Sequence, residues 1–152
     1  MKHLVGLTLG RYKINSLLGE GGMGAVFKAR DETLKRDVAL KVMNPQFSRL
    51  PNFQERFLQE ARTVARLSHP NIVQVFDFGQ QVVDEVQQLF IVMEFIPGQN
   101  LSSALKDYQS RNQPFPLLEA VEMMRQSALA LEYAHRQGVL HRDLKPDNII
   151  LR

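Results

Sequence analysis

Five short segments in the first 93 residues alternate apolar and polar positions or are apolar throughout, which predicts β-strands. They are residues 11–18, 25–30, 36–43, 72–78 and 88–93. Residues 79–87, between the last two, are polar and predict a loop. Three other segments predict helices, the longest with apolar residues at spacings of three and four. They are residues 51–67, 100–111 and 117–137. The pattern therefore predicts an α+β protein with a sheet before its main helices.

A glycine-rich segment, Gly19-Glu20-Gly21-Gly22-Met23-Gly24, lies between the first two predicted strands. In a dinucleotide-binding fold the third glycine of such a pattern would open a helix, but an alternating, strand-like segment follows here. We therefore expect a hairpin whose backbone N–H groups can approach phosphate oxygens closely, because glycine has no side chain. An ordinary glycine-rich hairpin is the alternative.

Two charges of opposite sign interrupt apolar segments. Lys41 stands inside the third predicted strand, and Glu60 falls in the apolar stripe of the helix over 51–67. A buried charge without a partner is costly, so a Lys41–Glu60 ion pair would resolve both. The alternatives are a lysine that reaches solvent and a solvated glutamate at the edge of the stripe. In the same helix, Asn52 and Glu55 have the spacing of an N-terminal capping box.

A polar loop, His141-Arg142-Asp143-Leu144-Lys145-Pro146-Asp147-Asn148, lies near the C-terminal end of the chain. Val139-Leu140 precede it and Ile149-Ile150-Leu151 follow it, so we expect a short buried strand on each side. A polar loop held between apolar segments is typical of an active site on a rigid scaffold. A solvated turn is the alternative.

The order His-Arg-Asp-x-Lys-x-x-Asn in this loop resembles the catalytic loop of protein kinases. Lys145, two residues after Asp143, is similar to the Ser/Thr-specific class. The glycine-rich segment, Val38-Ala39-Leu40-Lys41, Glu60 and the loop come in the order of that family, so the resemblance covers residues 11–152. The sequence Gly-Glu-Gly-Gly-Met-Gly-Ala-Val resembles the glycine-rich segment of bacterial Ser/Thr kinases of the eukaryotic-like (Hanks) type.

The resemblance implies a protein-kinase-like α+β fold. Residues 11–93 would form an N-terminal lobe with a five-stranded antiparallel sheet and one main helix. Residues 94–98 would be a hinge, and residues 99–152 would hold the first helices and the catalytic loop of a helical C-terminal lobe. The implied activity is transfer of the ATP γ-phosphate to Ser/Thr hydroxyls of protein substrates.

The resemblance also implies ATP and Mg²⁺ as cofactors. Asp143 would orient the substrate hydroxyl and accept its proton, and Lys145 would neutralise charge on the γ-phosphate. Asn148 would bind one Mg²⁺. Lys41, held by Glu60, would bind the α- and β-phosphates.

Further positions would contact the nucleotide. They are Gly19, Glu20, Gly21, Gly22, Met23, Gly24, Val26, Ala39, Lys41, Met93, Glu94, Ile96, Asn100 and Ile150. Val26 and Ala39 would pack on one side of the adenine and Ile150 on the other, while the hinge would bind its edge through backbone groups. Asn100 stands where many relatives have an acidic residue that contacts the ribose, so the chain departs from the family pattern there.

Composition changes this picture little. A length of 152 residues predicts one domain, and 44% apolar with 23% charged residues is ordinary for a globular protein. The net charge of +3 is too weak to indicate nucleic-acid binding. The sequence has no cysteine, which excludes disulfides and thiol chemistry and fits a reducing compartment, so we expect a cytoplasmic location. No apolar run reaches the ~18 residues of a membrane span.

The sequence ends at Arg152, before any Asp-Phe-Gly motif. We expect either a fragment of a longer kinase or a truncated product. A non-catalytic nucleotide-binding or interaction module is the alternative function. A homodimer formed through the N-terminal lobe is a further partnership that the resemblance suggests.

Overall fold

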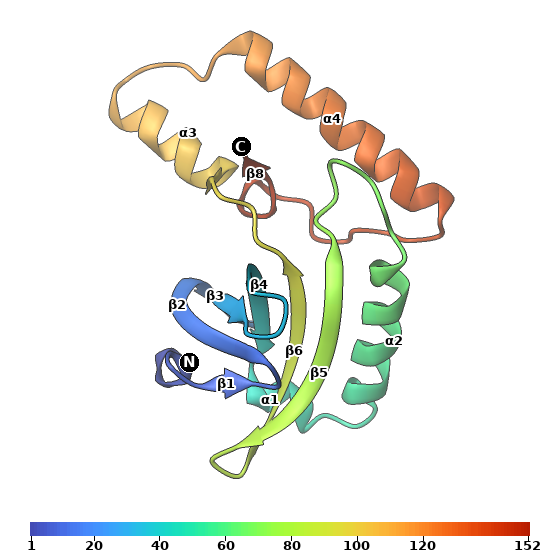
Figure 1. Ribbon diagram of the computed structural model, residues 1–152. Helices are drawn as coiled ribbons and strands as arrows, with labels where there is room; N and C mark the ends of the chain where they lie inside the picture. The colour runs from blue at the N-terminus through green and yellow to red at the C-terminus, as the bar shows by residue number, and fades with distance from the viewer. The chain divides into compact units, whose positions relative to one another are not determined.

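The computed structural model describes residues 1–152, which divide into two compact units (Figure 1). The first unit comprises Met1–Ser68 and Val73–Phe95. The second comprises His69–Ile72 and Ile96–Arg152. None of the helices combines the length and apolar content that crossing a membrane requires.

The first unit contains a curved, six-stranded antiparallel sheet with the strand order β1-β2-β3-β4-β6-β5 (Figure 1). Its strands are β1 (Thr8–Leu9), β2 (Tyr12–Gly21), β3 (Gly24–Asp31), β4 (Arg36–Met43), β5 (Val75–Val83) and β6 (Val86–Glu94). The five predicted strands are present. The sixth, β1, has only two residues, which is too short to show alternation.

Side chains from β5 connect the two edges of this sheet. Gln81 accepts a hydrogen bond from the Gly10 N–H at 2.7 Å and donates one to the Thr8 carbonyl at 3.3 Å. The Tyr12 hydroxyl donates to the Asp77 carboxylate at 2.7 Å. The Gln81 amide thus binds backbone groups beside β1 that no neighbouring strand pairs with, which is one way to protect a sheet edge.

The main core fills the inner side of the curved sheet. Its buried members are Leu4, Leu9, Tyr12, Ile14, Ala25, Phe27, Ala29, Val38, Leu40, Val42, Phe90 and Val92. Leu4 comes from a short 3₁₀ helix (Lys2–Leu4) and Leu9 from β1, and both are fully buried. Burying a leucine side chain stabilises a fold by about 1.5–3 kcal/mol. The first ten residues therefore contribute two buried side chains, Leu4 and Leu9, to the core.

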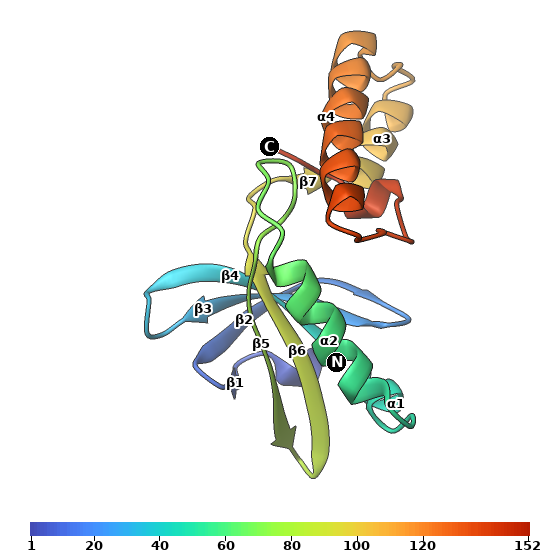
Figure 2. The same ribbon diagram turned by 90° about the vertical axis from the view of Figure 1, so that its right-hand side faces the viewer.

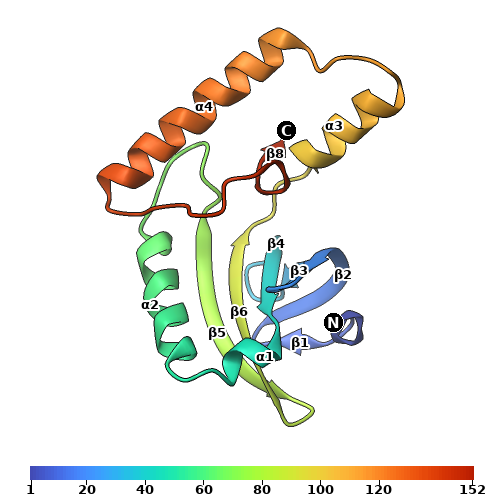
Figure 3. The same cartoon turned by 180° about the vertical axis from the view of Figure 1, so that it is seen from behind.

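Helix α2 (Phe53–Ala65) packs on the opposite face of the sheet, alongside β5 (Figures 2 and 3). Phe57 forms a second apolar cluster with Met43 and Leu89. The short helix α1 (Pro45–Ser48) precedes α2. The predicted capping box is wrong: Asn52 is the N-cap of α2, but its left-handed backbone (φ 59°) leaves its side chain without a cap hydrogen bond.

The predicted loop over residues 79–87 is also wrong. Strand β5 begins at Val75 rather than Ile72 and continues to Val83, and β6 begins at Val86. A two-residue turn of Asp84 and Glu85 connects them, with φ of 49° and 63°. Two-residue hairpin turns need positive φ and usually contain glycine or asparagine, so Asp-Glu gave no turn signal.

The second unit contains α3 (Leu101–Ser110) and α4 (Leu117–Arg136), as the sequence predicted. Its two-residue strands β7 (Gln99–Asn100) and β8 (Ile150–Leu151) pair antiparallel. Helix α4 ends at Gly138, whose φ is 75°. There the Val139 N–H donates to the Ala134 carbonyl and the Gly138 N–H to the His135 carbonyl, both at 2.9 Å, the pattern of a Schellman motif.

The prediction of a buried strand on each side of the polar loop is wrong: none precedes the loop, and β8 follows it but is not buried. Leu140 belongs to no strand and is 61% exposed, and Ile150 is 41% exposed in β8. Apolar composition predicted burial here, but both side chains are exposed in the structure. On α4, the apolar side chains of Leu117, Leu118 and Met124 are likewise exposed.

Candidate functional site

Four predicted nucleotide-binding residues share one face of the sheet. The strand register places Val26 opposite Lys41 and Ala39 opposite Met93. Directly opposed residues of antiparallel strands project from the same face, so these side chains lie together. Val26, Lys41 and Met93 are half-buried, whereas the other face of the same strands forms the core. The face therefore offers an apolar surface with the Lys41 ammonium beside it.

The predicted ion pair between Lys41 and Glu60 is not formed. Glu60 is exposed, and neither residue takes part in any ion pair of the structure. The buried side of α2 is made by Phe57 and Ala61. Because residues four apart lie above one another on a helix, the small Ala61 continues the stripe from Phe57 and Glu60 lies at its edge. The alternative of a solvated glutamate is what this structure contains.

The glycine-rich segment forms the β2–β3 hairpin, with Gly21 paired to Gly24. A strand and not a helix follows Gly24, so the arrangement is not that of a dinucleotide-binding fold. A Cβ atom at Gly24 would lie 2.2 Å from the Val42 carbonyl oxygen, so packing requires glycine there. Gly19, Gly21 and Gly22 have open space at that position and no positive φ.

Neither packing nor turn geometry therefore requires glycine at positions 19, 21 and 22. Their common property is an exposed backbone that a ligand can approach. The neighbouring residues tether the hairpin: Glu20 pairs with the Met1 amino group at 3.0 Å, and the Met23 carbonyl accepts a hydrogen bond from the Asn44 N–H at 3.0 Å. These observations favour a backbone binding site over an ordinary glycine-rich hairpin.

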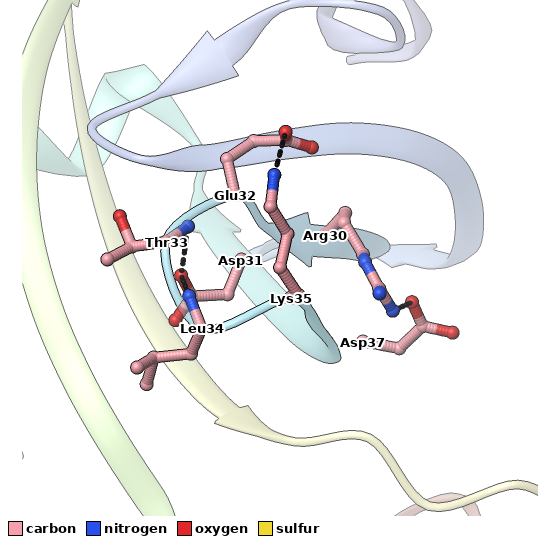
Figure 4. A network of polar contacts seen from close by, with 7 residues as sticks. All are labelled: Arg30, Asp31, Glu32, Thr33, Leu34, Lys35 and Asp37. Atoms are coloured by element: carbon pink, nitrogen blue, oxygen red, sulfur yellow. Dashed lines mark hydrogen bonds and ion pairs between the residues drawn. The ribbon is translucent and has the colours of Figure 1, made fainter.

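The last residue of β3, Asp31, is a buried acid that the sequence did not mark as functional (Figure 4). Asp31 is fully buried and accepts hydrogen bonds from the Thr33 and Leu34 N–H groups at 3.0 and 2.9 Å. Burial raises the pKa of Asp31, but these hydrogen bonds and the Arg11 guanidinium, 3.3 Å away, outweigh it and hold the pKa below its ordinary value. Asp31 thereby fixes the turn that leads into β4, the strand of Lys41. An aspartate at the end of a strand was the available signal, because its side chain can accept a hydrogen bond from the backbone two residues on.

In the second unit, the polar loop brings Asp143, Lys145 and Asn148 together. The Lys145 Nζ lies 3.0 Å from Asp143 Oδ2. The Asn148 amide donates to the Asp143 carbonyl at 2.7 Å and to Oδ2 at 3.2 Å. A 3₁₀ helix (Pro146–Asn148) and a left-handed Arg142 (φ 61°) give the loop its shape. This network is more specific than a solvated turn would need.

The Asp143 carboxylate is charged and accessible. The hydrogen bond from Lys145 is the largest cause that lowers the pKa of Asp143 below its ordinary value, and the one from Asn148 adds to it. The side chain is 60% exposed, and both of its hydrogen-bonded contacts involve Oδ2. Oδ1 therefore remains free to accept a hydrogen bond from another molecule.

The remaining predicted residues are distributed as follows. The Glu94 N–H donates to the Gln74 carbonyl at 2.8 Å, so that N–H is already engaged. The Asn100 side chain accepts a hydrogen bond from the Ser103 N–H at 2.8 Å and caps α3. Asparagine is one of the preferred residues at the N-cap of a helix. Ile150 pairs with Asn100 in the β7–β8 ladder.

No group of three or more His, Asp or Glu side chains is placed to hold a metal ion. Asn148 nevertheless offers one suitable oxygen. Its amide nitrogen makes both contacts to Asp143, so its Oδ1 is free beside the charged carboxylate. Oxygen ligands are those that Mg²⁺ prefers, and Mg²⁺ usually takes few of them from the protein and the others from water and phosphate.

Comparison with known proteins identifies the family of the chain. Residues 12–152 match the protein kinase domain family. The chain is 44% identical to the serine/threonine-protein kinase PknA of Mycobacterium tuberculosis, over 99% of this chain and 35% of PknA. It is 40% identical to the serine/threonine-protein kinase PknB of Mycobacterium leprae, over 93% of this chain and 22% of PknB.

A crystal structure of the Mycobacterium tuberculosis PknI kinase domain has the same fold, with a TM-score of 0.82 and 33% identity. The match covers 97% of this chain and 56% of that one. The chain thus spans about a third of the length of PknA and just over half of the solved kinase domain. The family model matches almost the whole chain and the fold agrees with the solved kinase domain, and the chain therefore belongs to the protein kinase family.

Proposed function

We propose that this chain is part of an enzyme that transfers the γ-phosphate of ATP to Ser or Thr hydroxyls of protein substrates. The observation that carries the proposal is the loop in which Lys145 and Asn148 hold the Asp143 carboxylate. The names of the relatives, which are serine/threonine-protein kinases, support the Ser/Thr class. In this reaction the second unit would act on the acceptor hydroxyl and the first unit would bind the nucleotide.

In this proposal, Asp143 acts on the acceptor. Its free Oδ1 accepts a hydrogen bond from the substrate hydroxyl and takes its proton as the oxygen bonds to phosphorus. Asp143 is ionised at neutral pH, as this role requires, because its pKa lies below the already acidic value of an ordinary aspartate. The Lys145 ammonium, 3.0 Å from the carboxylate, offsets negative charge on the transferred phosphoryl group.

The first unit binds the nucleotide in this proposal. Val26, Ala39 and Met93 supply an apolar surface for the adenine ring, and Lys41 supplies positive charge for its phosphates. The backbone of the glycine-rich hairpin covers the phosphates. Glu94 offers its carbonyl to the adenine edge, because its N–H is already bonded to Gln74.

Asn148 Oδ1 is the protein oxygen that would hold Mg²⁺. When bound, the ion supplies positive charge to the β- and γ-phosphate oxygens. The hydrogen bonds from the Asn148 amide to Asp143 fix which end of the amide faces outward. Asn148 thus keeps an oxygen available while it orients the catalytic carboxylate.

The proposal also covers the limits of the two lobes, the location of the protein and its self-association. The first unit ends at Phe95 and the second continues from Ile96, which supports residues 94–98 as the hinge between lobes at 11–93 and 99–152. We also propose a cytoplasmic location, because the reaction consumes ATP and the sequence has no cysteine for disulfides. Dimerisation through the N-terminal lobe stays a prediction that sedimentation of the full-length protein would test.

Lys41→Met in the full-length protein tests the proposal. Mass spectrometry of a protein substrate incubated with Mg-ATP should find phosphoserine or phosphothreonine with the wild type. The variant should lose about 10²–10³ in rate, the usual effect of removing one electrostatic stabiliser. Its thermal stability should change little, because Lys41 has no ion-pair partner to lose.

Lys106→Met, at an exposed position of α3, is the matched control and should keep the wild-type rate. Near-normal turnover of the Lys41→Met protein would contradict the proposal that Lys41 binds the phosphates of the nucleotide. The alternative function, a module that binds nucleotide without catalysis, predicts ATP binding and no phosphorylated product from the wild type.

A further inference from the structure

The face that carries Lys41 also has a polar group that the proposed function leaves unused. Lys28, on β3, lies directly opposite Ala39 and two residues along from Val26. Its Nζ is 2.9 Å from Asp37 Oδ2. The same Nζ lies over the Phe95 ring, 4.7 Å from the ring centroid, which is within the range of a cation–π contact.

Asp37 is itself held from two sides. Lys28 contacts its Oδ2 and the Arg30 Nη1 contacts its Oδ1 at 3.0 Å (Figure 4 shows the Arg30 contact). The hydrogen bonds from Lys28 and then Arg30 lower the pKa of Asp37, so it is ionised at neutral pH. Lys28 is 34% exposed, and its ammonium therefore lies between a fixed carboxylate and an aromatic ring.

Phe95 stands between Glu94 and Ile96, whose backbone groups are the proposed contacts to adenine. A ring that is held on one side restricts the backbone of its own residue. We infer that Lys28 is a positioning residue: held by Asp37, it fixes the Phe95 ring and so orients the backbone of residues 94–96 for adenine. This inference rests on the proposed function.

Direct phosphate binding by Lys28 is the competing explanation. The geometry favours positioning, because the Lys28 ammonium already has an anionic partner and a ring. Lys41 has neither an anionic partner nor a ring against its ammonium. In the strand register it lies opposite Val26, next to the glycine-rich hairpin. An ammonium without a partner is the better candidate to meet a phosphate.

Lys28→Met in the full-length protein separates the two explanations. A cation–π contact at a partly exposed site corresponds to about a two- to fivefold change in an equilibrium constant. We expect Kd and KM for Mg-ATP to rise by that factor with kcat almost unchanged. The Kd for Mg-tripolyphosphate, which has phosphates and no adenine, should stay the same in calorimetry.

Two further lysine variants give controls. Lys28→Arg can still pair with Asp37 and stack on Phe95, and it should restore ATP affinity. Lys13→Met removes an exposed lysine from β2 that has no ion pair, and it should change nothing. Unchanged ATP affinity in Lys28→Met would overturn the inference, and so would an equal loss of affinity for tripolyphosphate.

Phe95→Leu provides an independent variant that leaves the charge in place. It should weaken ATP binding by a similar factor. The double variant with Lys28→Met should bind ATP no more weakly than either single variant, because both substitutions remove the same contact between Lys28 and Phe95. Additive losses would contradict the inference. These binding measurements need no turnover, so a protein without phosphotransfer would reject the proposed function and leave this test readable.

Discussion

At the scale of single residues, the environment of each polar group decides what it can do. Asp143 has an accessible oxygen and a basic neighbour, whereas Asp31 has the same carboxylate but is fully buried and bound to backbone N–H groups. The sequence predicted Asp143 because its motif has a fixed order. It gave no comparable signal for Lys28, whose two partners come from residues 9 and 67 positions away along the chain.

Tyr12 offers a test at this scale. Burial and the hydrogen bond to Asp77 raise its pKa from 10.0 to about 12. Because the folded state favours the protonated phenol, this stabilisation is complete below pH 10 and is lost as the pH rises toward 12. The difference between ultraviolet titrations of the wild type and Tyr12→Phe should show one phenol ionising near pH 12. Ionisation near pH 10 would show that the Asp77 contact is absent in solution.

At the scale of elements, alternation predicted the strands and spacing predicted α3 and α4. The errors have local causes. The capping box failed because Asn52 has a left-handed backbone, and the β5–β6 turn was missed because Asp84 and Glu85 adopt positive φ without glycine. Glu60 was placed on the apolar stripe because Ala61, a small residue, was not counted as its continuation. Backbone conformation and small buried residues leave weak signals in a sequence.

The contact between β5 and the first residues gives a prediction at this scale. Gln81→Leu removes two hydrogen bonds to the backbone of Thr8 and Gly10. The free energy of unfolding should fall by about 1–3 kcal/mol, from net values of about 0.5–1.5 kcal/mol for each of the two bonds. Urea denaturation measures this loss, and the Gly10 amide should exchange faster.

Gln59→Leu, at an exposed position of α2, is the matched control for Gln81→Leu. It should leave stability almost unchanged, because the Gln59 side chain makes no hydrogen bond. Equal effects of the two variants would mean that the edge contact contributes nothing to the fold.

At the scale of the whole molecule, much apolar surface of the second unit has no cover. Leu117, Leu118, Val121 and Met124 on α4 are more than half exposed. Apolar patches of this kind mark surfaces that other parts of a protein cover or that cause aggregation. The solved PknI kinase domain is longer than this chain, which covers 56% of it.

We therefore expect the 152 residues alone to phosphorylate protein substrates far more slowly than the full-length protein. They should also bind a dye that reports exposed apolar surface, and they should keep weak affinity for ATP through the first unit. Parallel assays of both proteins with Mg-ATP, together with calorimetry, measure these differences. Robust, Asp143-dependent phosphorylation by the 152 residues would contradict this expectation.

The central claim is that Asp143 serves the acceptor hydroxyl and not the nucleotide. The most direct test is to measure turnover and ATP affinity together for Asp143→Asn in the full-length protein, with Asp107→Asn at an exposed position of α3 as the control. Asp143→Asn should lower turnover by ~10²–10⁴, the range for a positioned acid–base group, while the Kd for ATP stays within about twofold. Equal losses of turnover and ATP affinity, or an undiminished rate, would contradict this claim.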